Sequence, residues 1–86
     1  MKQFTYVIQD QLGIHARPAG LLVKTAKELD STVTVYKEGG KAAVATKLMA
    51  LMGLGIKGGD TVTVTVEGSD EDIAVVSMET FFRNNL

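Results

Sequence analysis

The stretch Thr61-Val62-Thr63-Val64-Thr65-Val66 alternates threonine with valine without interruption. Because successive side chains of a β-strand point to opposite faces, the valines share one face and the threonines share the other. The pattern predicts a strand that is buried on one side only. Parallel sheets are covered on both faces, so such a strand favours an antiparallel sheet with one face open to water.

Three further segments contain the β-branched and aromatic residues that are typical of strands. These segments are Phe4–Ile8, Thr32–Tyr36 and Lys41–Val44. The last two are separated by Lys37-Glu38-Gly39-Gly40, in which paired glycines can supply the positive φ angles of a tight turn. The sequence therefore predicts four strands, two of which form a hairpin.

Two segments show apolar residues at helical spacing. The first predicted helix runs from Ala16 to about Leu29, and its apolar residues are Ala19, Leu22, Val23, Ala26 and Leu29. The second is short and apolar, from Lys47 to Met52, with Thr46 as its N-cap and Gly53 as its stop.

The segment Ser69-Asp70-Glu71-Asp72 is predicted to cap a third helix, with acidic residues in the first turn that match the helix dipole. Its expected buried residues are Ile73, Val76, Thr80 and Phe81. The element order is then β-α-β-β-α-β-α in one domain, residues 1–86, of the α+β class. A four-stranded antiparallel sheet with its helices on one face would bury the apolar stripes of the helices.

Composition excludes several classes of function. The chain has no cysteine and one histidine, so it has no disulfide, no thiolate chemistry and no multi-histidine metal site. A net charge of −1 argues against a general nucleic-acid binder. No apolar run approaches the roughly 20 residues of a membrane span, and the N-terminus lacks a signal-peptide pattern. We expect a cytoplasmic monomer with no cofactor, no metal and no membrane insertion.

The segment Gly13-Ile14-His15-Ala16-Arg17-Pro18 contains the only histidine and the only proline of the chain. Proline fits the first turn of a helix, where its missing N–H has no cost. The N–H groups of that turn, at Ala16 and Arg17, and the helix dipole attract anions. The positive helix end also favours the neutral imidazole that nucleophilic attack requires. The segment predicts a site that holds a phosphoryl group on His15, although a lone histidine here could also be a simple surface residue or cap.

Charge is distributed unevenly along the chain. Residues 11–27 contain Arg17, Lys24 and Lys27 and no acid, and these three residues share one face of the first helix. This basic face adjoins His15 and could steer an acidic partner. An ordinary solvated helix face is the alternative interpretation.

The chain resembles the HPr family, the histidine-containing phosphocarriers of the bacterial sugar phosphotransferase system, over essentially its whole length. The resemblance rests on the segments Gly13-Ile14-His15-Ala16-Arg17-Pro18-Ala19, Leu48-Met49, Leu54-Gly55-Ile56 and Glu67-Gly68-Ser69-Asp70-Glu71. It implies an open-faced β-sandwich with sheet order 1-4-2-3. It also implies a carrier rather than an enzyme. His15 would take a phosphoryl group on Nδ1 from enzyme I, itself charged by phosphoenolpyruvate, and Arg17 would help to bind the group. His15 would then pass it to the enzyme IIA domain of a sugar permease.

The resemblance further implies one partner-binding surface around the histidine. Its residues would be Gly20, Leu21, Lys24 and Lys27 of the first helix and Lys47, Leu48, Met49 and Met52 around the short helix. A six-residue helix cannot bury all of its apolar side chains, so we expect part of this set to be exposed. Regulatory proteins are further possible partners.

Many Gram-positive members of the family carry a regulatory serine at the start of the middle helix. Numbering alone would place that site at Thr46, but alignment on Leu48-Met49 and Leu54-Gly55 places it at Lys47. Lysine cannot accept this phosphate, so we expect weak or absent regulatory phosphorylation.

Four other functions are alternatives, and two of them are disfavoured. The nitrogen-related branch of the same system uses identical chemistry with a different enzyme I. A regulatory docking module would bind partners without phosphoryl transfer. A hydrolase is disfavoured because no second carboxylate–histidine pair, cysteine or metal cluster accompanies the site. A catabolite-repression relative that has lost the histidine is also disfavoured, because His15 is present.

Overall fold

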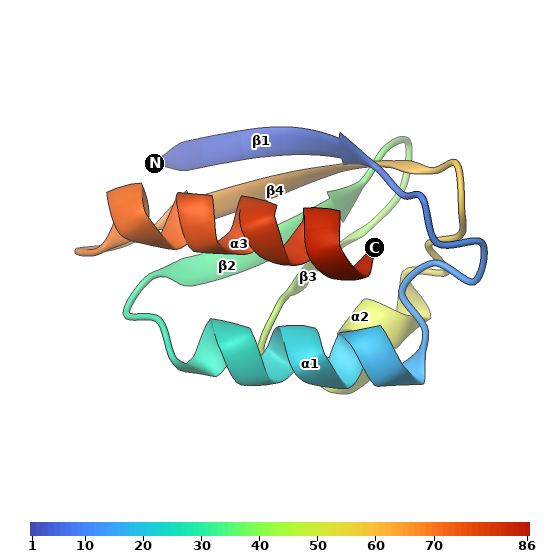
Figure 1. The fold of residues 1–86 in the computed structure, drawn as a ribbon, viewed down its shortest axis with the longest axis horizontal. Coiled ribbons are helices and arrows are strands. Elements are labelled where there is room, and N and C mark those ends of the chain that lie inside the picture. Colours follow the sequence, from blue (N-terminus) through green and yellow to red (C-terminus); the bar gives the residue numbers. More distant parts are fainter.

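The computed structural model describes residues 1–86. Its elements follow the predicted order, and their boundaries lie close to the expected positions (Figure 1). They are β1 (Lys2–Val7), α1 (Ala16–Lys27), β2 (Thr32–Lys37), β3 (Ala42–Val44), α2 (Leu48–Gly53), β4 (Thr61–Glu67) and α3 (Glu71–Asn85).

The four strands form one antiparallel sheet with the order β1-β4-β2-β3, which confirms the expected topology. The register places Val64 of β4 opposite Phe4 of β1 and Val35 of β2. The valines of β4 are fully buried and the threonines between them are partly exposed, so the predicted alternation is confirmed. In the β2–β3 hairpin Gly39 alone has a positive φ, 72°, and its neighbour Gly40 does not.

The helices lie on one face of the sheet and leave the other face open (Figure 1). α3 packs on β1 and β4, α1 buries its apolar residues in the same core as the strand valines, and α2 lies against α1 and β3. At the centre of the α3 contact the ring of Phe82 meets Phe4 and Tyr6 edge to face, with ring centroids 5.6 and 5.8 Å apart. Such aromatic pairs stabilise a core beyond the apolar area that they bury.

The predicted buried face of α3 is wrong. Ile73 and Val76 are 74% and 62% exposed, and Thr80 is exposed as well. The buried residues of the helix are instead Ala74, Met78 and Phe82, while Phe81 is half-buried. Both sets have helical spacing, so the sequence predicts the helix correctly but the wrong face of it as buried. The fit of the large Phe82 ring against β1 selects the second set.

The short helix also differs from its prediction. α2 begins at Leu48, so Lys47 and not Thr46 is its N-cap residue. The amide of Leu51 donates to the Lys47 carbonyl, which closes the first helical turn there. Gly53 belongs to the helix, and the chain takes its positive φ at Gly55, 66°.

α1 ends at Lys27, slightly before the predicted end near Leu29. The amides of Glu28 and Leu29 donate to the carbonyls of Thr25 and Ala26, three residues back, so the last turn tightens and the helix stops. Leu29 still packs against the core from outside the helix.

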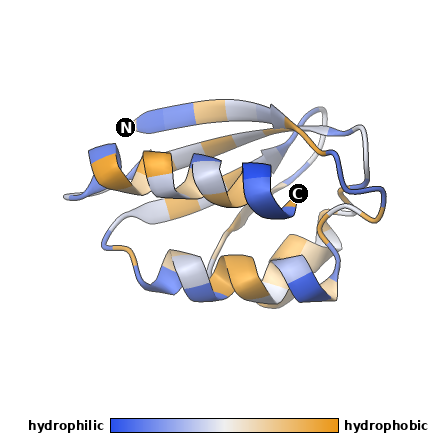
Figure 2. Cartoon of the chain, viewed as in Figure 1, coloured by the Kyte–Doolittle hydropathy of each residue, from blue (hydrophilic) through white to orange (hydrophobic).

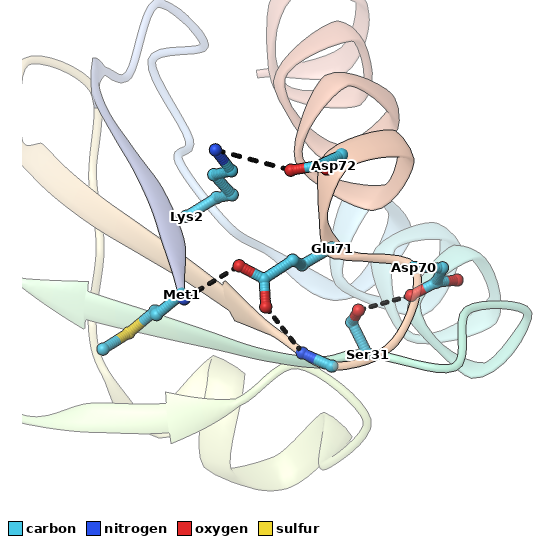
Figure 3. Close-up of polar contacts among 7 residues, drawn as sticks. Met1, Lys2, Ser31, Asp70, Glu71 and Asp72 are labelled. Carbon is cyan, nitrogen blue, oxygen red and sulfur yellow. Dashed lines mark hydrogen bonds and ion pairs between the residues drawn. The ribbon is translucent and has the colours of Figure 1, made fainter.

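The acidic residues at the start of α3, Asp70 to Asp72, contact other segments of the chain (Figure 3). The side chain of the N-cap residue Asp70 makes no capping bond and instead accepts hydrogen bonds from the Ser31 hydroxyl and the Asp30 amide. Glu71 accepts from the Gly68 amide and pairs at 2.8 Å with the Met1 ammonium. These contacts tie the start of α3 to β1 and to the α1–β2 loop.

Candidate functional site

His15 is the N-cap residue of α1, at the end of the loop that follows β1. Its backbone is extended, with φ −95° and ψ −175°, and its carbonyl accepts from the Ala19 amide at 2.9 Å. The side chain makes no capping hydrogen bond and is 37% exposed. The imidazole is therefore held at the helix end but remains accessible.

The loop before His15 is fixed by a close backbone contact with the segment after α2. Gly13 has a φ of +70°, and a Cβ there would lie 1.9 Å from the Ile56 carbonyl oxygen. That same oxygen accepts from the Ile14 amide at 3.2 Å, and the Ile14 side chain is buried. Only glycine fits position 13, because a side chain would need both a rare backbone conformation and a displaced loop.

The end of α3 fixes the same loop from the other side. The main-chain oxygen of Leu86 accepts from the amides of Gln9 and Asp10 at 2.6 and 2.8 Å. The Asp10 carboxylate accepts from the Leu12 amide at 2.9 Å, and the Asp10 carbonyl accepts from the Gly13 amide at 2.9 Å. The position of His15 therefore depends on three segments that are far apart in the sequence.

A pocket of about 350 Å³ opens beside the imidazole. It is lined by Asp10, His15, Arg17, Pro18, Leu21, Asn84 and Asn85. Of these residues, His15, Arg17 and Leu21 were predicted from the sequence as site or partner-binding residues. No local pattern marks Asp10, Asn84 or Asn85, because only the fold brings them to the histidine.

The chemistry of the pocket suits an anion. The amides of Ala16 and Arg17 lie in the first turn of α1 and have no hydrogen-bond acceptor in the protein. The Arg17 guanidinium is exposed and forms no ion pair. A phosphoryl group has oxygens that can accept from both kinds of donor. Asp10 is the opposing charge, with its Oδ2 3.8 Å from Nε2 of His15.

The predicted partner-binding residues are all exposed. Among the large side chains, the exposed fractions are 44% for Leu21, 41% for Leu48, 78% for Met49 and 39% for Met52. Gly20, Lys24, Lys27 and Lys47 are exposed too. Most of α2 is hydrophobic in Figure 2, yet Leu51 is its one buried residue. An apolar surface with a basic border therefore adjoins the histidine.

Thr46 and Lys47 have different surroundings at the start of α2. Lys47 is exposed at the N-cap, whereas Thr46 is half-buried one residue earlier. The residue at the helix start, where an added phosphate could meet free amides, is thus a lysine.

No cluster of three or more His, Cys, Asp or Glu side chains could hold a metal ion. No helix is both long and apolar enough to cross a membrane.

Comparisons with known proteins agree with the geometry. The family described as PTS HPr component phosphorylation site matches residues 2–84. Phosphocarrier protein HPr of Mycoplasma genitalium is 34% identical over 85 residues, which cover 99% of this chain and 97% of that protein. The solved histidine-containing phosphocarrier protein of a mycoplasma has a TM-score of 0.90 at 30% identity, over 96% of this chain and 93% of that one.

A third relative differs in assembly. The Bacillus subtilis catabolite repression protein Crh is 31% identical with a TM-score of 0.76, over 100% of this chain and 98% of its own, and was solved as a dimer with a swapped domain. The fold and the extent of these matches lead to one conclusion: the chain belongs to the HPr family of the phosphotransferase system, whose members are phosphocarriers and not enzymes.

Proposed function

We propose that His15 accepts a phosphoryl group on Nδ1 from phosphorylated enzyme I and passes it to enzyme IIA domains of sugar permeases. The observation that carries the proposal is the position of an accessible imidazole at the N-terminus of α1, in a pocket that Arg17 also lines and next to two first-turn amides without acceptors. Such donors would bind the oxygens of the attached group. Positioning and electrostatics from both partners would supply most of the rate.

Both partners would bind the exposed surface formed by α1 and α2. This surface combines flexible methionines with lysines, and methionine side chains adapt to differently shaped partners. Its position beside His15 would bring an incoming phosphoryl group to the ring. A carrier of this kind would work in the cytoplasm as a monomer and as a single domain of residues 1–86.

Intact-mass measurement after incubation with phosphoenolpyruvate and a sugar-system enzyme I tests the proposal. We expect the gain of one acid-labile phosphoryl group, and no gain by His15→Ala. The same incubation with an enzyme I of the nitrogen branch separates the two branches, because the cognate enzyme should label faster.

The second candidate is a docking role without phosphoryl transfer. The exposed surface around Met49 favours this role, because binding there does not require His15. Wild-type protein that binds partners yet gains no phosphoryl group from either enzyme I would support this role and contradict the carrier. Sedimentation at the concentration of the assay tests the monomer against a swapped dimer like that of Crh.

A further inference from the structure

We infer that Asp10 is a positioning residue for the phosphoryl relay: its carboxylate holds the Nε2 edge of His15 and stabilises the positive charge that the ring gains when Nδ1 carries phosphate. The inference rests on the proposed function. It adds a residue that no sequence pattern selects, in a loop whose other contacts explain why it is in place.

The two carboxylate oxygens of Asp10 make different contacts. Oδ1 accepts from the Leu12 amide at 2.9 Å, so the side chain is held by its own turn. Oδ2 is then the oxygen that faces His15, 3.8 Å from Nε2. This separation is that of an ion pair rather than of a hydrogen bond, and such contacts commonly shorten when a site is loaded.

The backbone of Asp10 is held as firmly as its side chain. Its amide donates to the main-chain oxygen of Leu86 and its carbonyl accepts from Gly13, at 2.8 and 2.9 Å. Leu86 is itself buried, 3% exposed, so the end of α3 braces the loop. A carboxylate placed in this way keeps its direction toward the ring without help from a partner protein.

The charges around the ring make its two nitrogens unequal. Asp10 and Arg17 are the charged side chains that line the pocket, and α3 contributes the neutral amides Asn84 and Asn85. A carboxylate at the Nε2 edge favours a proton on Nε2. The lone pair then resides on Nδ1, the nitrogen that does not face Asp10.

The transfer step balances without loss of a proton. The Nδ1 lone pair forms the N–P bond while the bond from phosphorus to the donor atom breaks, and that electron pair stays with the donor. Nε2 keeps its proton, the ring becomes cationic, and the Asp10 carboxylate offsets the new charge. In onward transfer the N–P electron pair returns to Nδ1, and the cationic ring is the better leaving group.

Asp10→Asn removes the charge but keeps an oxygen that can accept from the Leu12 amide. Asp60→Asn is the matched control, because Asp60 also accepts a loop amide, from Lys57 at 2.9 Å, and its side chain is 34% exposed against 36% for Asp10. Asp60 does not line the pocket.

We expect Asp10→Asn to gain the phosphoryl group from enzyme I about threefold to tenfold more slowly than wild type, and Asp60→Asn to match wild type. Once loaded, Asp10→Asn should hydrolyse more slowly near neutral pH, because less of its phosphorylated ring is protonated. The two hydrolysis rates should converge in mild acid, where the ring is protonated in both proteins. A general loss of structure would not produce this pH dependence.

The ¹⁵N signals of Nδ1 and Nε2 in the unphosphorylated protein provide a readout that needs no enzyme. They should differ between Asp10→Asn and wild type and stay unchanged in Asp60→Asn. Unchanged ring signals, unchanged hydrolysis or faster phosphoryl gain in Asp10→Asn would each overturn the inference. A wild-type protein that gains no phosphoryl group would instead overturn the proposed function, and the ring signals would still decide whether Asp10 and His15 are paired.

Discussion

The hydroxyl of Ser31 donates a hydrogen bond to the carboxylate of Asp70, and this bond joins the loop before β2 to the N-cap residue of α3 (Figure 3). Ser31 is 6% exposed and is the one buried polar residue of the chain. Its position also requires Gly68, since a Cβ there would lie 2.6 Å from the Ser31 Cα. The hydrogen bond holds the α1–β2 loop against the start of α3.

Acid should weaken this contact between the α1–β2 loop and the start of α3. The hydrogen bond from Ser31, and then that from the Asp30 amide, lowers the pKa of Asp70 below its ordinary value of 3.8. The Met1 ammonium, and then the Gly68 amide, lowers the pKa of Glu71 below 4.5. Carboxyls with lowered folded-state pKa values stabilise the fold above their ordinary values and lose that contribution as the pH falls through the folded-state values. The urea midpoint should therefore fall from pH 5 downward.

The test of this acid dependence is Asp70→Asn, which should show a shallower fall in the urea midpoint over the same pH range. Asp72→Asn is the control, because that carboxylate is 82% exposed. Equal slopes for wild type and Asp70→Asn would contradict the prediction.

Gly13→Ala should lower both stability and phosphoryl gain. A positive φ at a residue other than glycine costs about 1–3 kcal/mol, and the contact with the Ile56 carbonyl adds to that cost. Relief requires the loop to move, which displaces His15. Urea unfolding measures the first effect and the rate of labelling by enzyme I measures the second. Gly20→Ala is the stability control: a Cβ added at this position would meet nothing within 4 Å, so the substitution should stabilise α1 by up to about 1 kcal/mol.

The buried face of α3 predicts a large and a small loss of stability for truncation of two of its side chains. Phe82→Ala should destabilise by about 3–5 kcal/mol, because the ring is fully buried against Phe4 and Tyr6. Val76→Ala should change stability by less than about 0.5 kcal/mol, because Val76 is 62% exposed. If Phe82→Ala does not fold, Phe82→Leu should show a smaller loss in the same direction. A larger loss at position 76 than at position 82 would show that the helix is rotated.

Met49 and Ile73 allow a matched test of the partner surface. Both are apolar and similarly exposed, 78% and 74%, but Met49 lies on α2 beside the site and Ile73 lies on α3. Met49→Asp should reduce the rate of labelling at low enzyme I concentration by about tenfold, and Ile73→Asp should leave it unchanged. Thermal unfolding should be similar for both. Equal labelling rates for the two variants would show that α2 is not part of the partner-binding surface.

Lys47 should prevent regulatory phosphorylation at the start of α2. We expect an ATP-dependent kinase of this family's regulatory serine to leave Thr46 essentially unlabelled, since Thr46 is half-buried and precedes the N-cap. Lys47→Ser should gain labelling, because it places a hydroxyl at the exposed N-cap. Efficient labelling of Thr46 in wild-type protein would show that the alignment at this position is wrong.

Local patterns predicted most of the fold. The alternation in Thr61–Val66 identified a strand with one buried face, and the glycine and proline signals bounded its neighbours. Both depend on the backbone geometry of a few adjacent residues, which a sequence displays directly. The N-terminal position of His15 on α1 was predictable for the same reason, because Pro18 marks a first helical turn.

The buried face of α3 and the contacts between distant segments could be identified only from the tertiary structure. Two apolar sets on α3 have equal periodicity, and only packing against β1 selects the one that contains Phe82. Asp10 lies five positions before His15 in the chain, where no periodic rule relates the two side chains, and their approach depends on the loop being held by Leu86. The sequence by itself determined the strands, the helices and the place of His15 at the start of α1, because these follow from local geometry. The tertiary structure alone decided which charges surround His15, because that depends on segments brought together by the burial of a common core.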